Sequence, residues 1–308
     1  MRAIAFQEYG DSSRLDRMDL PDPKVGPDTV LIRVRAAGVN PVDWKAREGY
    51  LDGAFDVYFP VVPGWDVAGV VEQIGPSVTE FEAGDEVIGY LRRDEIRRGT
   101  YAELTPAPVR AVAAKPVAAS WTEAGGLPLT GLTALQALSA GRVGPGDTVL
   151  IHAAAGGVGH LAIQIARALG ASRVLGTASP SSHEFVTALG AEPVSYGADL
   201  VTDVERLAPD GVDAAFDFVG GETVDLSWAL VDDPSRVVSI TNAAGVKAGG
   251  GRYVFVRPDA DDLAQLSQWY DQGRLRVHLH RTFPLAEAAA AQDLVREGHV
   301  HGKVVLEV

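Results

Sequence analysis

The segment that most constrains this chain is a glycine-rich turn between an expected strand and an expected helix. Residues 148–152 form a short apolar run typical of a buried strand, and residues 158–169 carry apolar side chains at helical spacing. Gly156 and Gly159 match the last two glycines of G-x-G-x-x-G, and Ala154 replaces the first. Small residues here let backbone amides approach a pyrophosphate at the helix N-terminus, although a tight turn without ligand is the alternative. The expected cofactor contacts are Ala154, Gly156, Gly157 and Val158.

The next strand indicates which dinucleotide this turn would bind. In NAD-binding versions an Asp or Glu ends that strand and holds the ribose 2′-hydroxyl. Here the expected strand covers residues 173–177, and the following residues 178–183 contain no acid. The hydroxyl of Ser179 and the imidazole of His183 can donate hydrogen bonds to a 2′-phosphate, which a carboxylate would repel. The sequence therefore favours NADP(H), with ordinary turn and helix-cap roles as the alternative for both side chains.

Three regions of the chain differ in pattern. The first ~115 residues contain many short β patterns broken by Gly and Pro, which is typical of a compact barrel or sandwich. Strand and helix patterns then alternate to about residue 256, as in a parallel sheet covered by helices. The final stretch is too short for a separate domain and is expected to return to the first. The expected domains are residues 1–117, 118–257 and 258–308.

Composition narrows the partners and the environment. The chain has 308 residues, no cysteine and a formal net charge of −14. Without cysteine it can form neither a disulfide framework nor a thiolate zinc site. The acid excess disfavours nucleic acid, and no stretch resembles a membrane span or an apolar signal core. We therefore expect a soluble, cytoplasmic protein that binds neither nucleic acid nor a membrane.

Besides the glycine turn, six segments of the chain form an ordered set of motifs: GVNPVDWK at 38–45, PGWDVAGVV at 63–71, GDEV at 84–87, GTYAE at 99–103, LPLTGLTA at 127–134 and GKVV at 302–305. Together with the turn, they resemble the medium-chain dehydrogenase/reductase superfamily, and within it the zinc-free quinone oxidoreductase and enone reductase branch. The resemblance covers nearly the whole chain. It implies an α/β fold with a β domain: a GroES-like barrel, completed by the C-terminal tail, beside a Rossmann doubly wound parallel sheet, with the active site in the cleft between them.

The segments that carry zinc ligands in metal-dependent relatives differ here. Those relatives have Cys-His where this chain has Asn40-Pro41, and Gly-His-Glu where it has Gly64-Trp65-Asp66. A catalytic zinc site needs about three nitrogen, sulfur or carboxylate ligands and an open position. We therefore expect no metal, and stabilisation of the developing negative charge by hydrogen-bond donors instead.

The resemblance implies an NADPH-dependent reductase that transfers a hydride to a quinone or to the C=C bond of an enone or alkenal. Candidate catalytic donors are Asn40, Lys45 and Tyr50, with an ordinary surface lysine as the alternative for Lys45. Asp43 is expected to anchor a turn. Further cofactor contacts are expected from Thr130, Tyr196, Phe218, Val219, Thr241 and Lys303.

Other functions and assemblies stay open at this point. A pathway-specific enoyl reductase would use the same fold, and a non-catalytic NADPH-binding sensor would need only the cofactor site. Relatives are often homodimers joined through the last Rossmann strand, for which residues 253–256 are the candidate edge. Specificity in this branch lies in loops near 45–60, 91–99 and 245–256, and the glycine-rich segment 243–251 is expected to be flexible.

Overall fold

A computed structural model describes all 308 residues and divides them into two compact units. The first unit comprises residues 1–129, 257–273 and 277–308, and the second comprises residues 130–256 and 274–276. The first unit extends past residue 117, the expected domain boundary, because helix α2 (Trp121–Gly126) packs against its strands β3 (Thr29–Val39) and β5 (Asp66–Ile74).

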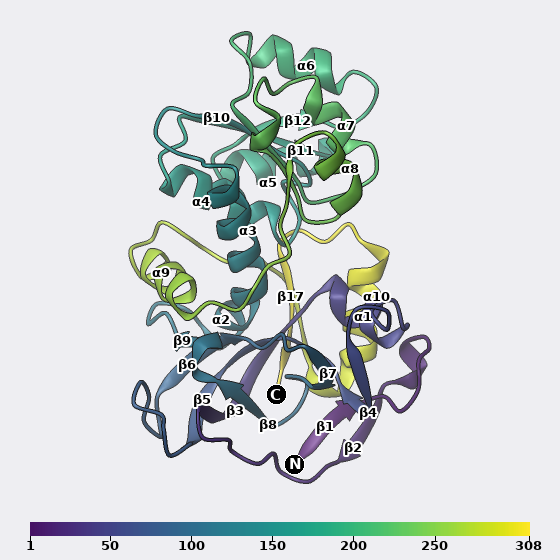
Figure 1. Cartoon of the computed structure of the whole chain (residues 1–308), viewed down its shortest axis with the longest axis vertical. Helices are drawn as coiled ribbons and strands as arrows, with labels where there is room; N and C mark the ends of the chain where they lie inside the picture. Colours follow the sequence, from purple (N-terminus) through teal and green to yellow (C-terminus); the bar gives the residue numbers. More distant parts are fainter. The chain divides into compact units, whose positions relative to one another are not determined.

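A seven-stranded sheet forms the centre of the first unit (Figure 1). Its order is β16-β17-β3-β5-β6-β9, and β8 also pairs with β3. The strands not yet bounded are β6 (Glu86–Tyr90), β8 (Leu104–Pro108), β9 (Val112–Ala114), β16 (Leu279–Pro284) and β17 (Lys303–Glu307). The C-terminal β17 runs antiparallel to β3 with Val304 opposite Val39. This register brings the next residues, Lys303 and Asn40, together although they are distant in the sequence.

Smaller elements complete the first unit. They are β1 (Arg2–Ala5), β2 (Asp16–Asp19), β4 (Asp56–Val62), β7 (Glu95–Arg98), α1 (Pro41–Arg47), α9 (Ala260–Asp271) and α10 (Ala288–Glu297). Helix α2 begins with a capping box, in which Ser120 Oγ accepts from the Glu123 amide and the Glu123 carboxylate accepts from the Ser120 amide. Apolar side chains of the sheet, including Ile32, Val67 and Leu306, are fully buried.

A six-stranded parallel sheet forms the second unit and confirms the predicted Rossmann architecture (Figure 1). The order is β12-β11-β10-β13-β14-β15, so the chain reverses direction across the sheet at β10. The strands are β10 (Thr148–Ile151), β11 (Arg173–Ala178), β12 (Glu192–Ser195), β13 (Ala214–Asp217), β14 (Val237–Ser239) and β15 (Arg252–Tyr253). The helices are α3 (Pro128–Ala140), α4 (Gly159–Ala168), α5 (His183–Ala188), α6 (Leu200–Leu207), α7 (Thr223–Trp228) and α8 (Ala243–Ala248).

Two local expectations were wrong. The glycine-rich segment expected to be a flexible loop contains helix α8, which begins where Asn242 Oδ1 accepts from the Gly245 amide. A methyl group on Gly249 would lie 2.3 Å from the Trp228 ring, so glycine is required there for close packing rather than for mobility. The candidate edge strand at 253–256 is also shorter than expected, because β15 covers only Arg252–Tyr253.

Candidate functional site

A buried polar cluster lies at the end of β3 in the first unit. Its central residue is Asn40, whose side chain is 1% exposed. Lys303 Nζ donates to Asn40 Oδ1 at 2.5 Å and to the carbonyl oxygen of Val39 at 3.2 Å. Asn40 Nδ2 donates to Asp66 Oδ2 at 2.8 Å. The amide of Asn40 therefore bridges a buried cation and a buried carboxylate.

Asp66 begins β5 and has no exposed surface. Its second oxygen, Oδ1, accepts from the backbone amide of Leu129 at 2.6 Å, near the start of α3. A Cβ atom on Gly38 would lie 2.6 Å from Asp66 Oδ2 and from the carbonyl oxygen of Gly125. The glycine that precedes Asn40 in the first matching segment is therefore required by the close approach of this carboxylate.

Asp43 anchors the turn into α1, as predicted. Its Oδ2 accepts from the backbone amide of Asn40 at 2.8 Å and from the Tyr101 hydroxyl at 3.0 Å. Burial raises the pKa of Asp43 to about 7, although the bonds from Asn40 and Tyr101 and the charge of Lys303 oppose that rise. The carboxyl group of Asp43 can therefore exchange a proton near neutral pH.

Burial also shifts the pKa values of the other charged members of the cluster. It raises the pKa of Asp66 and lowers that of Lys303, while their mutual attraction opposes both changes. Asp66 and Tyr101 were not among the site residues predicted from the sequence. Asp66 was considered only as a missing zinc ligand, and the available signal was a lone carboxylate within an otherwise apolar strand pattern at residues 67–71.

Lys45 and Tyr50 do not join this cluster. Lys45 is exposed on α1, and its Nζ lies 5.6 Å from the centroid of the Trp44 ring. Tyr50 is 70% exposed and packs edge-on against the same ring at 6.0 Å. The structure therefore separates these two candidate donors from Asn40, because α1 turns Asp43, Ala46 and Arg47 inward and Lys45 outward.

The glycine turn of the second unit has the geometry of a phosphate cradle. A Cβ atom on Gly159 would lie 2.1 Å from the Ala153 carbonyl oxygen, so only glycine fits where α4 begins. The nearest such contact for Gly156 is 3.3 Å, which leaves that face of the turn open. The backbone amides of Ala155, Gly157 and Val158 have no hydrogen-bond partner in the chain. These free donors at a helix N-terminus fit a pyrophosphate group.

Three predicted adenosine-side residues follow neighbouring strands. Ala178 of β11 pairs with Ser195 of β12, so the next residues, Ser179 and Tyr196, lie at the same sheet edge. Ser179 Oγ lies within 3.0 Å of two other serine hydroxyls, and His183 Nε2 lies 3.4 Å from Ser195 Oγ. Tyr196 is 64% exposed. No acid ends β11, as the sequence showed.

Asp217 organises the ends of β13 and β14. Its Oδ1 accepts from the amides of Val219 and Gly220 and from the Thr223 hydroxyl, at 2.7 to 2.9 Å. Its Oδ2 accepts from the hydroxyls of Ser239 and Thr241, at 2.6 and 3.0 Å. Burial alone would raise the pKa of Asp217, but these bonds outweigh it and lower that pKa. The carboxylate thereby fixes the segments that carry three predicted cofactor contacts, namely the half-buried Phe218 and the exposed Val219 and Thr241.

Two further second-unit residues are buried beside the turn or at the start of α3. His152 Nε2 lies 3.1 Å from the Ser227 hydroxyl oxygen, and burial lowers the pKa of His152 to about 4. It is therefore neutral at physiological pH. Thr130 is 3% exposed and directly follows Leu129, the residue whose amide Asp66 holds.

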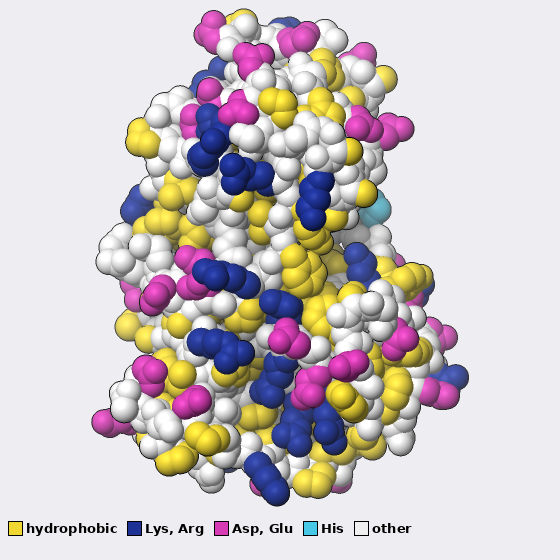
Figure 2. All heavy atoms as spheres, viewed as in Figure 1, with side chains coloured by type: hydrophobic (Ala, Val, Ile, Leu, Met, Phe, Trp, Pro, Cys, Tyr) yellow, Lys and Arg dark blue, Asp and Glu magenta, His cyan; other side chains and the backbone are white.

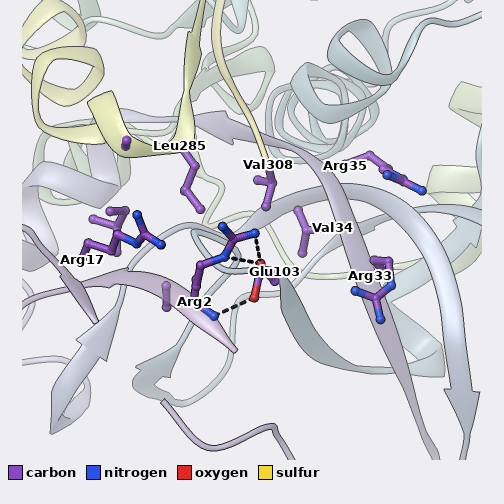
Figure 3. A pocket seen from close by; sticks show the side chains of 11 residues that line it. Arg2, Arg17, Arg33, Val34, Arg35, Glu103, Leu285 and Val308 are labelled. Carbon is purple, nitrogen blue, oxygen red and sulfur yellow. Dashed lines mark hydrogen bonds and ion pairs between the residues drawn. The ribbon is translucent and has the colours of Figure 1, made fainter. Parts of the chain in front are cut away.

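Other surface features lie apart from the predicted residues. A cavity of about 370 Å³ in the first unit is lined by basic side chains, including Arg2, Arg17 and Arg33, and contains none of the predicted site residues (Figure 3). Figure 2 shows Lys and Arg side chains gathered over the first unit on the face drawn there. No group of three or more His, Asp or Glu side chains in the structure is placed to hold a metal ion. None of the helices has the length and apolar character needed to cross a bilayer.

The second unit combines a doubly wound parallel sheet with an open glycine turn, and the chain leaves the first unit to build it and then returns. These features define the class of two-domain, dinucleotide-dependent dehydrogenases and reductases. Residues 26–117 match the family model of the alcohol dehydrogenase GroES-like domain, and residues 189–306 match that of the zinc-binding dehydrogenases. The chain belongs to the medium-chain dehydrogenase/reductase superfamily, and its relatives include quinone oxidoreductases and alkenal/enone reductases.

Individual relatives span almost the whole chain. An NADPH-dependent alkenal/one oxidoreductase of Arabidopsis thaliana chloroplasts is 34% identical over 99% of this chain and 79% of its own length. The structure of a quinone oxidoreductase from Coxiella burnetii is 34% identical, covers 100% of this chain and 99% of its own, and has a TM-score of 0.87. An NAD-dependent alcohol dehydrogenase structure is 32% identical, covers 100% of both chains and has a TM-score of 0.89. The fold is thus shared by relatives that differ in named cofactor.

Proposed function

We propose that this protein is an NADPH-dependent reductase that transfers a hydride to a quinone or to the C=C bond of an α,β-unsaturated carbonyl compound. The observation that carries the proposal is the buried cluster in which Lys303 and Asp66 hold the amide of Asn40, because it offers a neutral donor and no zinc-ligand set. Bound NADPH supplies the hydride. The chain supplies donors that stabilise negative charge developing on the substrate oxygen.

Free backbone amides in the glycine turn support the cofactor half of the proposal. Ala155, Gly157 and Val158 would bind the pyrophosphate, with Ala154 and Gly156 shaping the turn. Ser179, His183 and Tyr196 would surround the adenosine 2′-phosphate, where an acid would favour NAD instead. The remaining second-unit contacts are proposed to come from Thr130, Phe218, Val219 and Thr241.

Asn40 is the proposed substrate-side donor. One hydrogen of its Nδ2 bonds to Asp66, and the other has no partner in the chain. Lys45 and Tyr50 are exposed, so each would act only if substrate reaches the outer face of α1. Lys303, expected as a cofactor contact, has its ammonium group committed to Asn40 and Val39, which supports a role behind Asn40.

Cofactor oxidation by the purified protein tests the activity. NADPH and NADH are compared at 340 nm with a panel of alkenals, enones and quinones. Turnover that is faster with NADPH on one acceptor class is expected. Tight NADPH binding without turnover on any acceptor would contradict the reductase and favour the sensor function. Faster turnover with NADH would contradict the cofactor assignment alone.

Two substitutions separate the roles of Ser179 and His183 from general effects on the fold. Ser179→Ala and His183→Ala are expected to weaken NADPH binding about 3- to 10-fold each, the loss of one hydrogen bond to a charged group, and to leave NADH binding unchanged. Ser172→Ala is the matched control, because that hydroxyl donates to the Gly146 carbonyl oxygen elsewhere in the second unit. Equal losses for NADPH and NADH would show that neither side chain contacts the 2′-phosphate.

A homodimer and a cytoplasmic location are further parts of the proposal. Strand β15 is the last strand of the Rossmann sheet and offers an open edge of only two residues, Arg252 and Tyr253. Light scattering at micromolar protein concentration tests the dimer, and a mass near 32.5 kDa would rule it out.

A further inference from the structure

The orientation of the Asn40 amide is decided by the charges on its two sides. An amide can take two orientations that differ by a half-turn and that exchange its oxygen and nitrogen. The Lys303 ammonium can only donate, and its Nζ lies 2.5 Å from Oδ1. On the other side, Asp66 Oδ2 accepts from Nδ2 at 2.8 Å, while Asp66 Oδ1 accepts from the Leu129 amide. The reversed orientation would oppose two donors on one side and two acceptors on the other. Only one orientation satisfies both neighbours.

This arrangement leaves one hydrogen of the Asn40 side-chain amide uncommitted. Asn40 Nδ2 carries two hydrogens, of which one goes to Asp66 and the second has no partner in the chain. We propose that Asp66 and Lys303 are positioning residues that hold the Asn40 amide with this second hydrogen presented as a donor to an oxygen of the substrate. The inference rests on the proposed reductase function and deepens it, because it names the groups that preorganise the donor.

The second carboxyl oxygen of Asp66, Oδ1, holds the backbone near the start of α3. It accepts from the Leu129 amide at 2.6 Å, one residue before Thr130, a proposed cofactor contact. Asp66 therefore ties the substrate-side donor to the start of α3. Stability alone does not call for a buried carboxylate and ammonium here, because apolar residues of similar volume commonly stabilise a core as well or better. Orientation of Asn40 is the role that the geometry assigns to the pair.

Asp66→Asn is the direct test. The new side chain can still accept from Leu129, but its nitrogen faces Asn40 Nδ2 and destabilises the observed orientation. We expect kcat to fall about 10- to 100-fold, the usual consequence of misplacing a catalytic group, with a much smaller change in the Kd for NADPH. Asp271→Asn is the control: it removes a carboxylate charge from the same unit, at a side chain that accepts from the backbone amides of Val117 and Ala118 away from the cluster, and kcat is expected to stay within about twofold.

A double-mutant cycle distinguishes positioning from a structural role. If Asp66 acts through Asn40, then Asp66→Asn should change kcat by less than about twofold in an Asn40→Ala background. An equal loss of kcat in both backgrounds would overturn the proposal. Lys303→Met provides a second route should Asp66→Asn fail to fold, because it removes the donor to Asn40 Oδ1, and the same lack of additivity with Asn40→Ala is expected.

A measurement without turnover keeps the inference separate from the proposed function. In a ¹⁵N-labelled sample, the Asn40 side-chain amide is assigned by its absence in Asn40→Ala. We expect one of its hydrogens to be shifted downfield and protected from exchange by the bond to Asp66, and to lose both properties in Asp66→Asn. An unchanged resonance would overturn the positioning role. If the wild-type protein reduces no acceptor, the reductase function fails, and this resonance still decides whether Asp66 holds the amide.

Discussion

Each unit of the protein buries aspartate side chains near the ends of its strands, and the two units stabilise them differently. Asp217 in the second unit and Asp43 in the first are 0% and 2% exposed. The pKa of Asp217 is nevertheless lowered, while that of Asp43 is raised to about 7. Asp217 accepts from two backbone amides and three hydroxyl groups, but Asp43 only from one amide and one hydroxyl. The larger number of donors to Asp217, together with stronger desolvation and the nearby Asp66 charge at Asp43, separates the pKa values of the two groups.

This difference assigns different tasks to the two carboxyl groups. Asp217 is a permanent anion that fixes the segments after β13 and β14 through neutral donors. Asp43 lies close to the cluster of Lys303 and Asp66, where a change of its protonation alters the local charge near neutral pH. The second unit therefore holds an anion fixed by neutral donors at the ends of β13 and β14, and the first holds a carboxyl group whose charge responds to pH.

Removal of the Asp217 carboxylate should have the largest effect. Asp217→Ala removes the acceptor of the Val219 and Gly220 amides and of the Ser239 and Thr241 hydroxyls, and the free energy of unfolding is expected to fall by about 3 to 5 kcal/mol. Asp217→Asn keeps one acceptor oxygen and should cost about 1 to 2 kcal/mol. Urea unfolding measures both. A loss below about 1 kcal/mol for Asp217→Ala would mean that these donors find other partners.

Asp43 should make stability depend on pH in the opposite sense to an ordinary paired carboxylate. Its pKa is about 7 in the folded protein against an ordinary value of 3.8, so the folded state binds the extra proton between these values. The free energy of unfolding should fall as pH rises from about 4 to about 7, by at most ~1.4 kcal/mol per pH unit. Asp43→Asn should flatten that dependence, whereas Glu72→Gln, an exposed control, should not. An identical slope in Asp43→Asn would show that Asp43 is ionised throughout this range.

His152 should produce the reverse slope in the second unit. Burial lowers its pKa from 6.5 to about 4, so the unfolded chain binds a proton that the folded state does not. Stability from this group is present above pH 6.5 and is lost as pH falls toward 4, again at most ~1.4 kcal/mol per pH unit but over a narrower range. His152→Gln, which can still donate to Ser227, should abolish this loss of stability between pH 6.5 and 4. His299→Gln, at an exposed histidine, should retain the loss. If both variants abolish the loss of stability, another group is responsible for it.

The two units also differ in how much of their sites the sequence predicts. The glycine turn lies within a single strand-turn-helix segment, so the local spacing was enough to predict a glycine-rich turn between β10 and α4. The cluster around Asn40 joins residues separated by 26 and 263 positions, and its assembly depends on the register of β17 against β3. No local pattern encodes that register. Lys45 and Tyr50 have suitable chemistry and lie near Asn40 in sequence, but the phase of α1 places Lys45 on the outside.

The smallest expected effect comes from removing single hydroxyl donors to Asp217. Thr241→Val removes one of the donors to Asp217, at an exposed side chain, and leaves the two backbone amides in place. The free energy of unfolding should fall by about 0.5 to 1 kcal/mol, and the pKa of Asp217 should rise. Ser239→Ala should have a larger effect, because the Ser239 hydroxyl is buried, donates to Asp217 at 2.6 Å and accepts from the amides of Thr241 and Asn242. Carboxyl ¹³C titration follows the pKa in both variants. A pKa unchanged by either substitution would show that the backbone amides alone keep Asp217 ionised, and the contrast with Asp43 would then depend on amide donors rather than on their total number.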